Sequence, residues 1–326
     1  MRITSSPPPA RNGIVPLVAA LLVLGCADGP AGPEGGPRAL LPQPLINGVD
    51  DFDRSAVGAI MIYQPSHPSS PGWRSTCTAT LIHKRVLVTA GHCIQGIQAG
   101  LQSGVYHAAW ISFQQDPQEH FNADPAVADP SSAGWYAIES LHDNPANPDF
   151  GDIGHYLEIH PDFHDSGAIT LAEQVKGIKP MKLPTRPGEV EALLGRADCI
   201  DGVDCGLVAL GYGLREFPPQ SPVLQARQSA PLRYMDVDAR WVWTYQLVTP
   251  DSEYGAICFG DSGGPVVLQK ENGRDRTIVA IAAEVEDPLR FVTCASDLAA
   301  LNYRMDTEEH LDFMKQVIRA SLSQKQ

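Results

Sequence analysis

Short apolar runs separated by turn-forming residues constrain the fold of this chain more than any other feature. The runs are rich in Val, Ile, Tyr and Trp, and Gly, Pro, Asp and Ser bound them. They include AVGAIMIY (56–63), RVLVTA (85–90), GLVALGYG (206–213), RWVWTYQLV (240–248) and TIVAIAAEV (277–285). Such spacing predicts an all-β sandwich or barrel.

Only the C-terminal segment has a clearly helical pattern. Within residues 305–322, an apolar stripe recurs at helical period, and Asp306 with Glu309 makes a capping box. The stripe consists of Leu311, Met314, Val317 and Ile318. We expect this helix to pack on the body of the protein, and we expect two long loops at 122–134 and 143–151.

The N-terminal segment has the pattern of an export signal. Residues 1–25 carry Arg2 and Arg11 as their charges, followed by an apolar run that is too short to span a bilayer comfortably. The stretch LVLGC resembles a bacterial lipobox, in which Cys26 receives lipid; the alternative is a plain signal peptide cut slightly later. Residues 26–44 are rich in Gly and Pro and predict a tether or pro-segment. We expect a lipoprotein on the outer membrane or cell surface, otherwise a secreted or periplasmic protein.

The cysteines and the charge narrow the class of protein. Seven cysteines are present, and setting Cys26 aside leaves six, which suits three disulfides in an oxidising compartment. A zinc site at Cys199 and Cys205 lacks two further ligands nearby, so we expect no metal and no cofactor. The formal charge is −14 and no basic run occurs, which argues against nucleic-acid binding. We expect a monomer.

Two motifs carry chemistry. Ser262 lies in GDSGGP and His92 in TAGHC. A serine hydroxyl is a weak nucleophile unless a base removes its proton. Together the motifs resemble those of the chymotrypsin-like (trypsin-family) serine proteases, whose third motif is an aspartate before short apolar residues. In GDIGHYLEI, Asp152 precedes Ile153, which gives the family's order of His, Asp and Ser. Asp149 is the alternative.

The resemblance covers residues 45–320 and is weak over 95–145 and 160–200. It implies two six-stranded antiparallel β-barrels, at 45–165 and 166–326, with the active site between them and a C-terminal α-helix. It implies a triad in which His92 is the base, Asp152 orients it and Ser262 attacks. The backbone N–H groups of Gly260 and Ser262 would form the oxyanion hole.

The resemblance also implies disulfides and an activation step. Cys77 would pair with Cys93, and Cys258 with Cys294, whereas a bond between Cys199 and Cys205 would close a local loop without a family counterpart. Asp261 would form an ion pair with a new N-terminus. The segment LING predicts a cut before Leu45 or before Ile46, and neither bond is a trypsin site.

The primary pocket follows from the same resemblance. Ala256 would form its floor, and Val285 and Leu301 its walls, which favours cleavage after small or aliphatic residues. Ala283 stands where the family often has a serine that supports the triad aspartate, and Glu284 replaces a tryptophan.

These patterns indicate a serine endopeptidase that acts on proteins or peptides. The alternative from another class is an inactive binding protein on the same fold, at the cell surface. An esterase is disfavoured because the chain order differs from that of the usual hydrolase fold.

Overall fold

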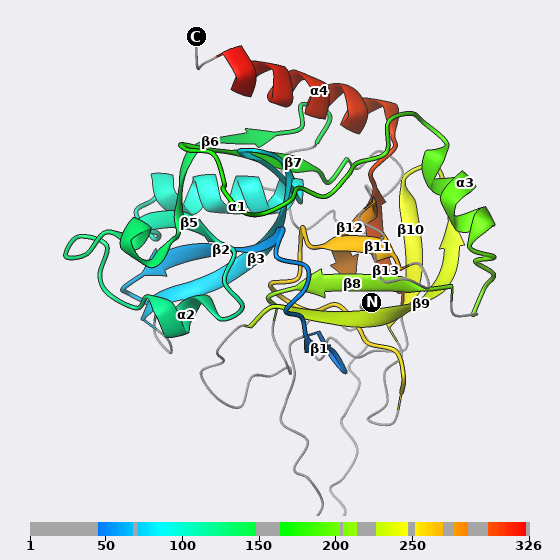
Figure 1. The fold of residues 1–326 in the computed structure, drawn as a ribbon, viewed down its shortest axis with the longest axis horizontal. Coiled ribbons are helices and arrows are strands. Elements are labelled where there is room, and N and C mark those ends of the chain that lie inside the picture. Colours follow the sequence, from blue (N-terminus) through cyan, green and yellow to red (C-terminus); the bar gives the residue numbers. More distant parts are fainter. Residues whose placement is uncertain are drawn as a thin grey trace, which may run out of the picture. The chain divides into compact units, whose positions relative to one another are not determined.

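Two six-stranded antiparallel β-barrels and a C-terminal helix are the main elements of the described part of the chain (Figure 1). The computed structural model describes residues 45–67, 71–147, 164–202, 205–213, 226–246, 252–269, 277–285 and 299–323. These residues all belong to one unit, Leu41–Gln326. The predicted fold class is therefore confirmed.

The first barrel closes in the strand order β2-β3-β4-β7-β6-β5, and β5 pairs back onto β2. Its strands are β2 (Val57–Gln64), β3 (Gly72–His83), β4 (Val86–Thr89), β5 (Ala108–Ser112), β6 (Tyr136–Asp143) and β7 (Gly167–Leu171). Because β7 closes this barrel, the first barrel extends beyond the boundary that the sequence analysis places at residue 165.

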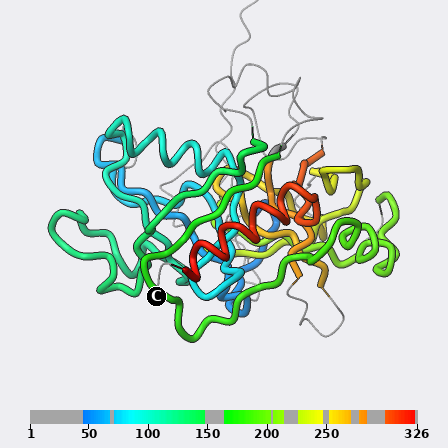
Figure 2. The backbone as a smooth tube through the Cα atoms, turned by 90° about the horizontal axis from the view of Figure 1, so that it is seen from above, coloured from blue at the N-terminus to red at the C-terminus, as the bar shows by residue number. Residues whose placement is uncertain are grey.

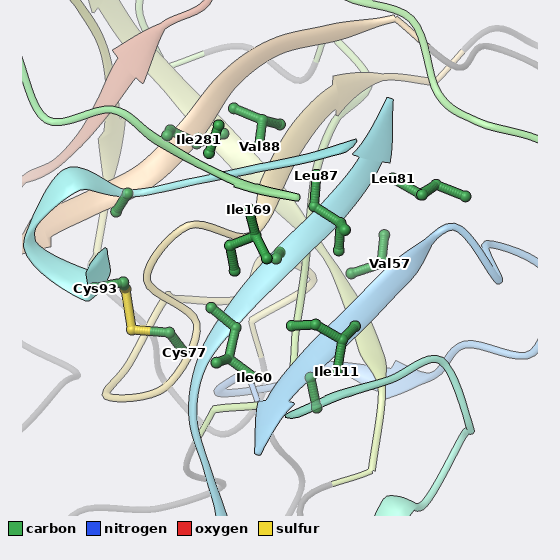
Figure 3. Packing of buried hydrophobic residues seen from close by; sticks show 14 of the residues in the cluster. Val57, Ile60, Cys77, Leu81, Leu87, Val88, Cys93, Ile111, Ile169 and Ile281 are labelled. Atoms are coloured by element: carbon green, nitrogen blue, oxygen red, sulfur yellow. A yellow bond between two sulfur atoms is a disulfide. The ribbon is translucent and has the colours of Figure 1, made fainter. Parts of the chain in front are cut away.

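Branched aliphatic side chains fill the first barrel. Ile60, Leu87, Ile111 and Ile169 gather in its interior and are fully buried (Figure 3). Strands alternate their side chains between two faces, so one residue from each of four strands can meet at one level. Burial of each such side chain contributes about 1.5–3 kcal/mol, which makes this barrel a rigid support for whatever its loops carry.

The second barrel has the strand order β9-β10-β13-β12-β11-β8 and closes through pairing of β8 with β9. The short strand β1 (Val49–Asp50) adds to the edge of β9. The barrel strands are β8 (Leu207–Gly211), β9 (Gln228–Val237), β10 (Trp241–Tyr245), β11 (Pro265–Leu268), β12 (Ile278–Val285) and β13 (Ala299–Arg304).

Helices are more numerous than the sequence analysis expects. The helix α1 (Gly91–Gln102) follows β4 directly, with α2 (Pro117–His120), a 3₁₀ turn (Pro130–Ala133) and α3 (Glu189–Arg196) further along. In α1, Ile94 and Ile97 are buried on the face toward the first barrel. With its glutamines and glycines, α1 has too weak an apolar pattern to be read from sequence.

The C-terminal helix α4 (Glu308–Ser323) runs above β6 and β7 in Figure 1, and Figure 2 shows it from above. Its predicted stripe is confirmed, because Leu311, Met314 and Val317 are buried. The predicted capping box is wrong. Asp306 is buried and binds Arg304 and the N–H of Val190 instead.

Thr307 caps this helix in place of Asp306. Its Oγ1 accepts a hydrogen bond from the N–H of His310 at 3.3 Å. At the other end, Nη2 of buried Arg85 donates to the Ser321 carbonyl oxygen at 2.9 Å, which ties the helix to the start of β4. No helix in the described ranges is long and apolar enough to cross a membrane.

A buried cation joins the two barrels. Arg227, next to β9, donates to the carbonyl oxygens of Val57 at 3.3 Å and Phe113 at 3.0 Å, both in the first half of the chain. Its guanidinium also donates to the Tyr212 hydroxyl, which in turn donates to the Gln114 carbonyl at 2.6 Å. Buried charges persist where their hydrogen bonds are satisfied, so this network holds the barrels in one arrangement.

Candidate active site

His92 is the second residue of α1, which begins at Gly91 shortly after the end of β4. The Cys77–Cys93 disulfide joins this start to β3 (Figure 3). Gly91 has a steric role here, because a Cβ at that position would lie 2.1 Å from Nδ2 of Asn147. The His92 side chain is 22% exposed, so one edge of its ring can reach a substrate.

Asp165 is the carboxylate that binds His92. Its Oδ2 lies 2.8 Å from His92 Nδ1, and its Oδ1 accepts from the His92 backbone N–H at 2.9 Å. Asp165 is fully buried. The two contacts hold both the ring and the backbone of the histidine, so Nδ1 carries the proton and Nε2 is left as the basic nitrogen.

Asp165 was missed in the sequence because small residues follow it. Ser166 and Gly167 stand where the expected pattern has apolar residues. A Cβ at Gly167 would lie 2.4 Å from Cγ1 of Ile94 in α1, so the packing of the helix requires glycine. Ser166 accepts a hydrogen bond from Nδ2 of Asn144 at 2.9 Å. The expected aspartate, Asp152, and its alternative Asp149 lie outside the described residues.

A buried polar chain lies beside Asp165. His164 Nδ1 is 3.0 Å from the Tyr303 hydroxyl, which is 2.9 Å from Thr307 Oγ1. His164 lies in the segment before β7, Tyr303 lies in β13, and Thr307 directly precedes α4. Ala283, in β12, is buried and offers no hydroxyl. This polar chain links the segment that carries Asp165 to the C-terminal part of the chain.

Burial and charge act in opposite directions on His92. Burial is the largest single influence and lowers the pKa of its imidazole. The charge of Asp165 and the hydrogen bond to it together outweigh burial and raise the pKa of His92 above its ordinary value of 6.5. A histidine of this kind accepts a proton readily, which is what a general base requires.

Ser262 lies on a tight turn before β11. Gly260 has φ +98° and Gly263 φ +79°, conformations that favour glycine. A Cβ at Gly263 would lie 2.1 Å from Thr89 Oγ1, so the turn packs directly on the first barrel. The Thr78 N–H donates to the Ser262 carbonyl oxygen at 2.9 Å.

His92 and Ser262 both contact the sulfur of Cys93. Cys93 Sγ lies 3.6 Å from His92 Nε2 and 3.6 Å from the Ser262 carbonyl oxygen. Among the described residues, no hydrogen bond joins Ser262 Oγ to His92. Catalytic hydrogen bonds are often long without substrate and shorten in the reacting complex.

Asp261, beside the serine, is buried in a cage of backbone. Its carboxylate accepts from the N–H of Cys258 at 2.9 Å and of Gly213 at 2.8 Å. A Cβ at Gly211 or Gly213 would lie within 2.4 Å of a carboxylate oxygen, which explains both glycines of the GYG motif. Burial raises the pKa of Asp261 to about 7, although both hydrogen bonds act against it.

The segment LING lies against the same region. Ile46 and Ala256 exchange two backbone hydrogen bonds, at 3.0 and 3.1 Å. Leu45 is fully buried, with a positive φ of 47°. Asn47 Nδ2 lies 3.3 Å from the carbonyl oxygens of Ser252 and Tyr254. These hydrogen bonds anchor the start of the described chain beside Ala256, the expected pocket floor.

The structure describes the side chains of Ala256 and Leu301, but not that of Val285, among the expected pocket residues. Ala256 is fully buried, and Gln246 exchanges two hydrogen bonds of 3.1 Å with the backbone of Ile257 next to it. Leu301 is also fully buried and belongs to the apolar core cluster. Val285 ends β12, and its side chain lies outside the described residues.

The structure joins Cys77 to Cys93 and Cys199 to Cys205. Cys258 is disulfide-bonded, and Cys294 lies outside the described residues. Because the sulfurs of Cys77 and Cys93 are bonded to each other, their closeness to His92 offers no thiolate to a metal ion.

Comparison with known proteins supports the fold. Neither the family models nor the curated protein sequences match this chain. Solved structures do match. Human heparin binding protein superposes with a TM-score of 0.53 at 15% identity, over 84% of this chain and 97% of that protein. HL collagenase superposes with a TM-score of 0.51 at 16% identity, over 85% of this chain and 98% of that protein. The chain thus has the chymotrypsin-like double β-barrel fold.

Proposed function

We propose that this chain is a serine endopeptidase. The observation that carries the proposal is the pair of contacts between His92 and buried Asp165, with the Ser262 turn on the other side of Cys93. An oriented histidine beside a serine on a glycine-rich turn is the arrangement that activates a hydroxyl.

The reaction has two steps. His92 Nε2 takes the Ser262 proton as Oγ bonds to the substrate carbonyl carbon. The protonated ring then gives this proton to the amine as the carbon–nitrogen bond breaks, which leaves an acyl-enzyme. Water hydrolyses the ester with the same base. Asp165 stabilises the imidazolium in both steps, and the N–H groups of Gly260 and Ser262 receive the negative oxygen.

We assign the triad aspartate to Asp165 in place of Asp152. A triad aspartate acts by holding the histidine in one tautomer, which requires direct contact with Nδ1. Asp165 makes that contact and also binds the backbone N–H of His92.

Activation would follow a cut between Pro44 and Leu45. The N–H of Ile46 already donates to the Ala256 carbonyl oxygen. A new ammonium group on Leu45 is therefore freer to pair with Asp261 than one on Ile46. Asp261 is a buried carboxylate whose pKa is raised to about 7, and an ammonium partner would offset its burial. Sequencing the N-terminus of the active species tests this step.

A binding protein on the same fold is the rival. One similar structure is named for binding heparin, a polyanion. This chain has a formal charge of −14, which repels polyanions. Its catalytic residues also include a full set of base, orienting acid and serine.

Labelling with a fluorophosphonate and, in a separate unlabelled sample, digestion of casein test the proposed function. We expect wild-type protein to be labelled at Ser262, and Ser262→Ala and His92→Ala to lose both labelling and proteolysis. Equal proteolysis by Ser262→Ala would refute the assignment.

We also propose that Cys26 carries lipid after export. A single acyl chain binds a membrane only marginally, whereas several anchor it stably. Cys26→Ser should then move from the membrane to the soluble fraction. Wild-type protein that already fractionates as soluble would contradict the proposal.

A further inference from the structure

Thr78 makes four hydrogen bonds around the serine turn, and its hydroxyl makes two of them. Oγ1 donates to the Gly260 carbonyl oxygen at 2.9 Å, and the Tyr212 N–H donates to Oγ1 at 3.0 Å. Its N–H donates to the Ser262 carbonyl oxygen, and its own carbonyl oxygen accepts from Thr89 Oγ1 at 2.8 Å. Thr78 is fully buried in β3.

The direction of each hydroxyl bond follows from its partner. A carbonyl oxygen can only accept and a backbone N–H can only donate. The single proton of Thr78 Oγ1 must therefore point to Gly260, and a lone pair must face Tyr212. The hydroxyl thus has one arrangement, in which Thr78 of the first barrel holds both Gly260, on the turn before β11, and Tyr212, directly after the end of β8.

Gly260 is the residue whose orientation most needs support. At φ +98° it has no side chain to restrict it, and its N–H is one of the two proposed oxyanion donors. An oxyanion hole works only if its donors already point to the position of the developing charge. With its carbonyl oxygen held by Thr78, the Gly260 backbone has less freedom to turn.

We propose that Thr78 is a positioning residue, whose hydroxyl holds the turn that carries Gly260 and Ser262 in the conformation that forms the oxyanion hole. This inference rests on the proposed function, since it names a support for the same site. Thr78 touches no substrate and acts through Gly260. The first barrel therefore supplies the base, His92, and also a contact that restricts the turn that carries Ser262.

The chain provides a matched control two residues away. Thr80 lies on the same strand, is also fully buried, and its Oγ1 has no hydrogen-bond partner among the described residues. Thr78→Val and Thr80→Val make the same isosteric change. Only the first leaves a carbonyl oxygen and an N–H without their partner. Thr78→Ser keeps the hydroxyl and serves as the rescue variant.

The first experiment measures kcat and KM on a peptide substrate, and the inhibition constant of a peptide aldehyde that forms a tetrahedral adduct. Loss of a whole oxyanion donor lowers kcat by about 10²–10³-fold. Because Thr78→Val keeps the donor but loosens it, we expect a smaller loss of about tenfold in kcat, with KM unchanged. Aldehyde affinity should fall by the same factor as kcat/KM. Thr80→Val and Thr78→Ser should remain near wild type.

The second experiment measures amide hydrogen exchange over residues 258–264, which needs no activity. We expect faster exchange in Thr78→Val alone. Equal kcat in Thr78→Val and Thr80→Val, or a loss confined to KM, would overturn the inference while leaving the proposed function intact. A wild-type protein that neither cleaves peptides nor reacts with fluorophosphonate would overturn the proposed function. In that case unchanged exchange in Thr78→Val would overturn the support role as well.

Discussion

Asp165→Asn tests the assignment of the orienting carboxylate most directly. The amide oxygen of the variant can still accept from the His92 backbone N–H, where Oδ1 now lies at 2.9 Å. Its NH₂ group then faces Nδ1, where Oδ2 now lies at 2.8 Å. Since an NH₂ group can only donate, Nδ1 must become the acceptor and the ring proton must move to Nε2. His92 then has no lone pair toward Ser262.

The expected loss is large. In a Ser–His–Asp triad this change lowers kcat by about 10⁴-fold through the wrong tautomer, or ~5 kcal/mol at about 1.4 kcal/mol per tenfold. The opposite amide orientation offers no escape, because the NH₂ group would then face the His92 N–H. We expect little change in stability relative to this effect, since shape and volume are conserved.

The pH profile provides a second readout. Wild-type kcat/KM should fall as the pH drops through the pKa of His92, which lies above 6.5 because Asp165 stabilises the imidazolium. In Asp165→Asn that charge is gone. The acid limb of the remaining activity should therefore move to lower pH.

Asp143→Asn is the matched control. It changes a half-buried carboxylate of β6 whose hydrogen bonds come from Gln95 and Asn147. Most activity should remain in this variant. If Asp165→Asn stays within about tenfold of wild type, or if Asp152→Asn is the variant that loses activity, the assignment of Asp165 is wrong.

Three further predictions concern buried groups and specificity. His310 is fully buried, neither ring nitrogen has a hydrogen-bond partner in the described part of the chain, and burial lowers its pKa to about 3. The contribution of His310 to stability is complete above pH 6.5 and is lost as the pH falls toward 3. In acid, His310→Leu should therefore lose less stability than the wild-type protein. Urea titrations of both proteins at pH 4 and pH 7 measure this, and an equal loss of stability between the two pH values would contradict it. For Asp261, whose pKa is raised to about 7, stability depends on pH in the opposite direction. Its contribution is complete below pH 3.8 and is lost as the pH rises through 7, by up to ~4 kcal/mol at about 1.36 kcal/mol per unit. Cutting before Leu45 should remove that loss, which melting curves of cut and uncut protein between pH 4 and 8 can measure; parallel curves would argue against the ion pair. Finally, Ala256 provides no carboxylate for a buried cation, so a peptide library should show cleavage after small or aliphatic residues, and dominant cleavage after Arg or Lys would show that the pocket is assigned incorrectly.

The sequence alone determined the features that depend on neighbouring residues. Short apolar runs rich in Val, Ile, Tyr and Trp and bounded by turn-forming residues predicted the strands, because β-branched and aromatic side chains favour the extended backbone. The glycines around Ser262 suit a tight turn, because glycine tolerates the positive φ that Gly260 and Gly263 have. The apolar stripe of α4 is visible for the same local reason.

Only the tertiary structure decided which distant groups meet. Asp165 lies 73 residues from His92 along the chain, and its local pattern of small residues reflects the packing of Ile94 against Gly167. Thr78 looks like any strand residue until the barrels come together and its hydroxyl meets Gly260. Such contacts depend on the closure of two barrels and their relative placement. Sequence periodicity carries no information about either, because it records which face of a strand is buried and not what covers it.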